Sequence, residues 1–312
     1  MDQSSPSSPV IVGIDGSTAA LRAALWAVDE AVSRDTPLRL VHVVPASGHD
    51  LDEALADARD VLHKAWTEVE ATGKPVKIES DIVHGDPGQA LIEASRAAQL
   101  VCVGSKGTHD SPRRRRASTA ATVARGAASP VAVVRCRDTH KSSPFHKWII
   151  AVLDQSPESH SVLKTAVDEA LLRHAPVLAL TCSSASTRDK DGTARSGRRA
   201  SLARYLKDAQ EKDADIQVCV LPMPDSILNL LEQSHTIDQL VIVGSSRHEL
   251  VDETAGLSGS QGAAEVELLL AVHRKSSRGG RRSCQRSLRS RPFSGATTQS
   301  FLSRSCRLPT GP

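Results

Sequence analysis

The chain has 312 residues, of which 39% are hydrophobic and 24% charged, and this balance excludes a wholly disordered protein. Only seven residues are aromatic, so the core must consist of Ala, Val, Leu and Ile side chains, as in parallel strands covered by Ala-rich helices. The formal charge of +3 hides an asymmetry, because the segment from Arg274 onward holds ten basic and no acidic residues. No apolar run approaches the length of a membrane span and the N-terminus lacks the pattern of a secretory signal, so we expect a cytoplasmic protein.

Strand and helix patterns alternate along the first half of the chain. Short apolar runs predict the strands, and apolar positions at helical spacing predict the helices. The predicted strands are 10–15, 38–44, 76–83, 100–103 and 131–134, and the predicted helices follow Ser17 and cover 51–71, 87–97 and 118–128. Because strands that alternate with helices pair in parallel through right-handed crossovers, we predict an α/β domain with a doubly wound, five-stranded parallel sheet.

The second half of the chain repeats the first. The segment 11–17 recurs as 150–156 at an offset of 139 residues, and 99–105 recurs as 239–245 at an offset of 140. The pair Asp29-Glu30 recurs as Asp168-Glu169, and we expect these acidic residues on the solvated face of their helices. The second repeat has predicted strands at 148–153, 177–182, 216–221, 240–243 and 268–272, and predicted helices after Ser156 and at 201–212 and 225–234.

Composition divides the chain into five segments. These are a flexible N-terminus (1–8), a first domain (9–138), a linker (139–146), a second domain (147–273) and a basic tail (274–312) that we expect to be disordered. The tail resembles neither repeat, and a frame change that replaced the native C-terminus is one explanation. We favour a solvated loop for the arginine run 113–116, and any contact of this run or the tail with nucleic acid would be weak and non-specific.

Two features lie beyond the carboxyl ends of strands, where sheets of this kind bind ligands. Asp15 ends the first strand, and Gly104-Ser105-Lys106-Gly107 follows the fourth strand, nine residues before Ala117-Ser118. Glycine N–H groups and a helix N-terminus can together hold a phosphate. The alternative is that these loops only turn the chain, with Asp15 and Asp154 capping the helices that follow, and the motif alone does not decide between the two interpretations.

These residues resemble the universal stress protein family in its tandem-domain form. The likeness rests on Asp15, on the Gly-x-x-Gly loop nine residues before a small residue and Ser118, and on the repeat order, and it covers residues 8 to about 250. It implies two Rossmann-like domains of the adenine nucleotide alpha hydrolase type, ATP as ligand with or without Mg²⁺, and a nucleotide-dependent regulatory role in the stress response. The ATP-binding residues that it implies are Asp15, Val43, Gly104, Lys106, Gly107, Ser118 and Thr119.

Three positions depart from the family pattern. Ala117 stands where the family has Gly, and Arg247 and Leu257 replace the corresponding glycines of the second repeat. We therefore expect one nucleotide at most, in the first repeat; the alternative function is an interaction scaffold with decayed sites that binds no nucleotide.

Enzyme signatures are missing, so we predict at most a weak ATP hydrolase without an assigned catalytic or metal-binding residue. Family members pair through their last strands, which predicts an intramolecular pseudo-dimer through 131–134 and 268–272 and leaves homo-oligomers open.

Overall fold

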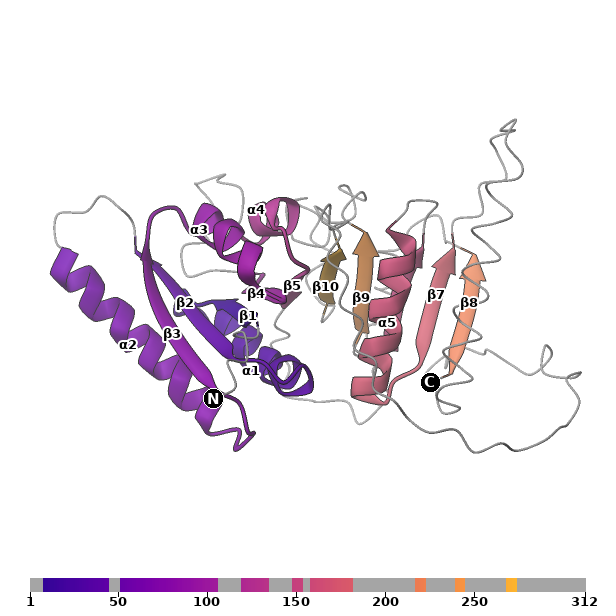
Figure 1. Cartoon of the computed structure of the whole chain (residues 1–312), viewed down its shortest axis with the longest axis horizontal. Helices are drawn as coiled ribbons and strands as arrows, with labels where there is room; N and C mark the ends of the chain where they lie inside the picture. The colour runs from indigo at the N-terminus through magenta and orange to yellow at the C-terminus, as the bar shows by residue number, and fades with distance from the viewer. Residues whose placement is uncertain are drawn as a thin grey trace, which may run out of the picture. The chain divides into compact units, whose positions relative to one another are not determined.

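The computed structural model describes residues 8–44, 51–105, 119–134, 148–153, 158–181, 217–222, 239–244 and 268–273 (Figure 1). The strands are β1 (Val10–Gly13), β2 (Leu38–Val44), β3 (Ile78–His84), β4 (Leu100–Gly104), β5 (Val131–Val134), β6 (Trp148–Leu153), β7 (Val177–Thr181), β8 (Val218–Pro222), β9 (Gln239–Gly244) and β10 (Leu268–His273). The helices are α1 (Thr18–Ser33), α2 (Leu51–Glu70), α3 (Pro87–Ala94), the 3-10 turn η1 (Ser95–Ala97), α4 (Thr119–Gly126) and α5 (Ser159–Arg173). The predicted helices 201–212 and 225–234 lie outside the described residues.

The described strands form one sheet in the order β3-β2-β1-β4-β5-β10-β9-β6-β7-β8. Neighbouring strands are parallel within each half, so each repeat contributes five strands in the same doubly wound order. The two halves meet where β5 pairs antiparallel with β10, with Val131 opposite Val272. The predicted fold, two tandem α/β domains of Rossmann-like topology, is therefore confirmed.

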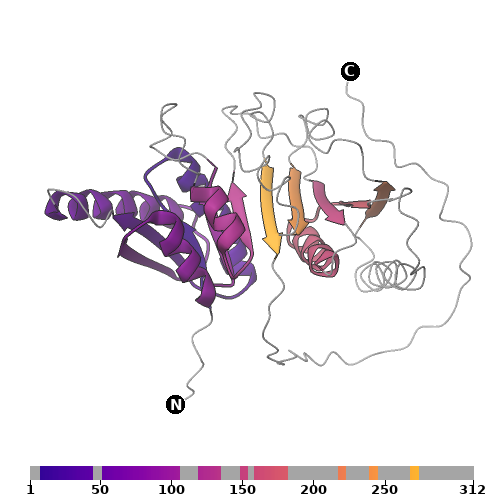
Figure 2. The same cartoon turned by 90° about the horizontal axis from the view of Figure 1, so that it is seen from above.

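Helices cover both faces of the N-terminal part of the sheet (Figure 2). Side chains alternate along β1, so Val10 and Val12 pack in a core with α1 and α2, whereas Ile11 packs in a second core with α3 and α4. Ala side chains dominate the buried stripe of α1, as the low aromatic content requires. Within the described ranges, no helix combines the length and the apolar character needed to cross a bilayer.

The expectation that both acidic pairs lie on a solvated face is wrong for Glu30 and Glu169. Glu30 is 0% exposed and Glu169 5% exposed, because α1 and α5 bring them to the junction of the two repeats. Arg34 and Arg173, one turn further along the same helices, each form ion pairs with both carboxylates. These four residues are called the interface cluster below. The neighbouring aspartates keep exposed side chains, as predicted.

Candidate functional site

The candidate site lies at the carboxyl ends of β1, β2 and β4. β2 pairs with one side of β1 and β4 with the other, so the strand order reverses at β1. The switch point of the first repeat, where sheets of this kind bind ligands, therefore falls between β1 and β4. Gly13 is in register with Val41, and Val12 with Cys102. Asp15 and two of the other predicted ligand residues, Val43 and Gly104, are therefore brought to the same edge of the sheet.

Asp15 is exposed and shapes the turn between β1 and α1. Its Oδ1 accepts a hydrogen bond from the Ser17 N–H at 3.0 Å, and the Ser17 hydroxyl in turn accepts one from the Ala20 N–H at 3.1 Å. Ser17 thus caps α1, as predicted, while Asp15 supports the cap instead of providing it. A carboxylate has about four acceptor positions, so this role is compatible with a ligand contact at the same side chain.

Gly104 lies against the first turn of α1. A methyl group at this position would lie 2.6 Å from the Ala19 carbonyl carbon and 2.7 Å from the Ala20 nitrogen, too close for any non-bonded contact. The next residue is also fixed, because the Ser105 N–H donates to the Val134 carbonyl at 2.9 Å. Glycine is therefore required here by helix packing, and this packing places the start of the glycine loop beside the N-terminus of α1.

His42 also belongs to this edge of the sheet, although nothing in its local sequence distinguishes it from an ordinary strand residue. Its half-buried ring places Nδ1 2.7 Å from the carbonyl oxygen of Ile14, the residue before Asp15. Because a carbonyl can only accept, Nδ1 carries the proton and donates. The imidazole therefore ties the end of β2 to the segment that holds Asp15.

The remaining predicted ligand residues are only partly described. Thr119 is the exposed first residue of α4. Lys106, Gly107 and Ser118 lie outside the described residues, as do Ala117 and the positions that distinguish the second repeat. Within the described part of the chain, no three His, Cys, Asp or Glu side chains converge in a way that could hold a metal ion.

Comparisons with known proteins agree with this architecture. The model of the universal stress protein family matches residues 7–135 and again residues 146–261. Universal stress protein Rv2624c of Mycobacterium tuberculosis is 37% identical over 270 residues, which cover 85% of this chain and 96% of that protein. Universal stress protein Rv2028c of the same organism is 36% identical over 281 residues, which cover 87% and 98%.

A solved structure supports the fold independently of close sequence similarity. The crystal structure of a universal stress protein from Archaeoglobus fulgidus is 18% identical, covers 87% of this chain and 98% of its own, and superposes with a TM-score of 0.61. Two matches of the family model in one chain also account for the internal repeat at offsets of 139 and 140 residues. On these grounds the chain belongs to the universal stress protein family, in the form that carries two repeats.

Proposed function

We propose that this protein binds an adenine nucleotide, ATP, in the crevice of its first repeat, and that it acts as a nucleotide-dependent regulatory module in the cytoplasmic stress response. The observation that carries the proposal is the position of Asp15 and Gly104 on either side of the switch point between β1 and β4. The nucleotide-binding domain spans residues 9–138, and the domain of residues 147–273 pairs with it.

We assign each part of the nucleotide a partner in the first repeat. The exposed carboxylate of Asp15 accepts hydrogen bonds from the ribose hydroxyls, and Val43, half-buried at the end of β2, offers an apolar surface to the adenine ring. The backbone N–H groups that follow Gly104 hold the phosphates, assisted by Lys106, Gly107, Ser118 and Thr119. Any Mg²⁺ would then be carried mainly by the phosphate oxygens, because these are hard ligands that Mg²⁺ prefers.

Replacing Asp15 by Ala is expected to weaken ATP binding about 10- to 100-fold, since a hydrogen bond to a charged group is worth roughly 1.5–3 kcal/mol. The Asp15→Asn variant should lose less, because an amide oxygen can still accept from the Ser17 N–H and from one ribose hydroxyl. Isothermal titration calorimetry of the full chain with ATP measures both variants. Thermal unfolding without nucleotide shows whether the β1–α1 turn has been preserved.

Glu68 supplies the control for this experiment. It is an exposed carboxylate in the last turn of α2, at the far end of this helix from the loop that leaves the carboxyl end of β2. The Glu68→Ala variant should bind ATP like the unmodified protein. If the full chain binds no ATP at millimolar concentration, or if Asp15→Ala binds as well as Glu68→Ala, the proposed site is wrong.

One observation favours the scaffold alternative. Packing against Ala19 and Ala20 is sufficient to require glycine at position 104, so this glycine is expected whether or not a phosphate binds beside it. A scaffold would keep its protein partners when Asp15 is changed to Ala, whereas a nucleotide-dependent module would change its partners together with its ATP affinity. Affinity capture of protein partners by the unmodified chain and by Asp15→Ala, each with and without added ATP, distinguishes these outcomes.

A further inference from the structure

The interface cluster brings two buried carboxyl groups together at the junction of the repeats. Arg34 Nη2 lies 2.5 Å from Glu30 Oε2 and 3.3 Å from Glu169 Oε1. Arg173 mirrors this arrangement, with Nη2 2.5 Å from Glu30 Oε1 and Nε 3.0 Å from Glu169 Oε2. Each guanidinium thus bridges both carboxylates, and the internal repeat relates Glu30 to Glu169 and Arg34 to Arg173.

Burial and proximity make it costly to keep both carboxyl groups ionised. Burial is the main effect that raises the pKa of Glu169, and the nearby charge of Glu30 adds to it, so that the pKa reaches about 7 despite the attraction of both arginines. Glu169 therefore changes charge within the physiological pH range, beside Glu30 and between the two guanidinium groups.

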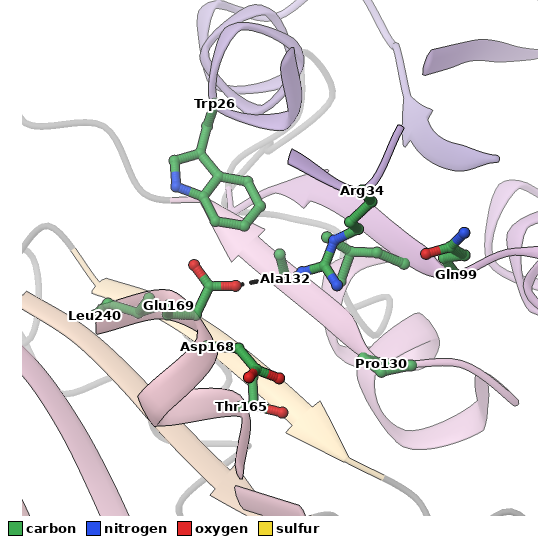
Figure 3. A pocket seen from close by; sticks show the side chains of 10 residues that line it. Trp26, Arg34, Gln99, Pro130, Ala132, Thr165, Asp168, Glu169 and Leu240 are labelled. Carbon is green, nitrogen blue, oxygen red and sulfur yellow. Dashed lines mark hydrogen bonds and ion pairs between the residues drawn. The ribbon is translucent and has the colours of Figure 1, made fainter. Parts of the chain in front are cut away.

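Water can reach Glu169 from one side. A cavity of about 50 Å³ is bordered by Arg34 and Glu169 and by Thr165 and Asp168 of α5, with the Trp26 ring closing another side (Figure 3). This volume exceeds the roughly 10–15 Å³ that one water molecule needs, and its polar side chains provide hydrogen-bonding partners for water. Protons can therefore exchange with solvent without separation of the repeats.

Other charged and ionisable groups surround Glu169 and Glu30. Burial alone would lower the pKa of Arg34, but the charges of Glu30 and Glu169 outweigh it and raise the pKa, so this guanidinium stays protonated. Burial raises the pKa of the Cys102 thiol on β4 well above its usual value, so the thiol stays neutral. Arg173 contributes the second guanidinium, which is paired with both carboxyl groups. The exposed Asp168 is paired with a lysine on its own helix, and the cavity residues from β5 and β9 are apolar.

We propose that the interface cluster is a pH-sensitive joint, in which a proton on Glu169 holds the two repeats together and its loss above neutral pH weakens their contact. The proposal does not depend on nucleotide binding. The direction follows from linkage, since the folded chain retains this proton at pH values where an ordinary carboxyl of the unfolded chain has lost it. Stability from this joint is therefore greatest at mildly acidic pH and falls as the pH rises toward about 7.

Replacing Glu169 by Gln tests the joint, because an amide has the shape of the protonated acid and cannot ionise. Between pH 5.5 and 8, the equilibrium constant for unfolding should rise roughly 30-fold more in the unmodified full chain than in Glu169→Gln. Proton linkage gives this ratio for a carboxyl group whose pKa is 4.5 in the unfolded chain and about 7 in the folded chain. Urea unfolding at a series of pH values measures this ratio. The Asp168→Asn variant is the matched control, because it changes the adjacent exposed carboxylate and should keep the pH dependence of the unmodified protein.

A second measurement observes the proton itself. Carbon-13 NMR of the full chain with labelled glutamate should show one carboxyl group that titrates near pH 7 and that disappears from this range in Glu169→Gln. If that variant does not fold, Glu30→Gln replaces it, and the signal near pH 7 should then move toward the ordinary carboxyl range, because the Glu30 charge that helps to raise the pKa of Glu169 is gone. Titration of all glutamates in the ordinary carboxyl range, or an unchanged pH dependence of stability in the glutamine variant, would overturn the proposal.

Discussion

Replacing Arg173 by Met is expected to lower the free energy of unfolding by about 3–5 kcal/mol at pH 8, where Glu169 is ionised, the usual cost of removing one partner from a buried ionic network. Arg173 contacts both Glu30 and Glu169, and its guanidinium lies 4.9 Å from the centre of the Trp26 ring. Methionine keeps much of the apolar stem, so the loss reports mainly on the charge and its hydrogen bonds. Urea unfolding followed by circular dichroism measures it.

Lys164 provides the control on the same helix. Its ion pair with Asp168 has a length of 3.0 Å, comparable to those of the cluster, but the two side chains are 62% and 56% exposed. Exposed pairs of this kind contribute only about 0.3–0.5 kcal/mol, so Lys164→Met should leave the free energy of unfolding nearly unchanged. Equal losses in Arg173→Met and Lys164→Met would mean that the interface cluster is not buried in solution.

A double variant separates the charge imbalance from lost packing. In Arg173→Met combined with Glu169→Leu, Glu30 and Arg34 remain as a balanced pair on α1. At pH 8, where Glu169 of the unmodified protein has lost its proton, the double variant should therefore be more stable than Arg173→Met alone, because no uncompensated carboxylate stays at the junction. If the loss of unfolding free energy in the double variant equals the sum of the losses in Arg173→Met and in Glu169→Leu, the two residues act independently.

The interface cluster shows where prediction from the sequence ended. The strand and helix pattern of the first repeat was predictable, and β2 and β5 begin and end at the predicted residues. The recurrence of Glu30 with Arg34 as Glu169 with Arg173 was also visible in the sequence. Their burial was not, because in an isolated repeat this part of α1 would face solvent. The ion pairs of Arg34 with Glu169 and of Arg173 with Glu30 form only because α1 and α5 approach each other across the junction of the repeats.

The candidate site was predictable to a similar extent. The carboxyl ends of parallel strands meet at one edge, so Asp15, Val43 and Gly104 could be expected there from their places after three predicted strands. Two contacts could not be predicted: the packing of Gly104 on α1 and the hydrogen bond from His42 to the Ile14 carbonyl. Both depend on the distance between elements, which the order of the elements does not give. A glycine that looks like a ligand residue can thus be required by the fold.

Gly104→Ala is the substitution that tests this requirement, and it is expected to destabilise the protein by about 3 kcal/mol or more. The added methyl group would meet backbone atoms of Ala19 and Ala20 at 2.6–2.7 Å, and backbone atoms at the start of a helix cannot rotate away as a flexible side chain can. Either α1 or β4 must move, and both support the edge that holds Asp15. ATP binding should therefore weaken together with stability.

Gly73→Ala is the matched comparison, because it adds the same methyl group in open space. Gly73 has a φ of +64° and no atom within 4 Å of the added carbon, so its cost comes only from the left-handed backbone, about 1–2 kcal/mol. Urea unfolding of both variants, with calorimetry for ATP, gives the comparison. A larger loss for Gly104→Ala, with weaker ATP binding confined to that variant, is expected because position 104 lies against the N-terminus of α1, whereas position 73 has no atom near the added carbon. A loss for Gly104→Ala no greater than that for Gly73→Ala would mean that β4 and α1 are not in close contact in solution, and the candidate crevice would then lack its supporting wall.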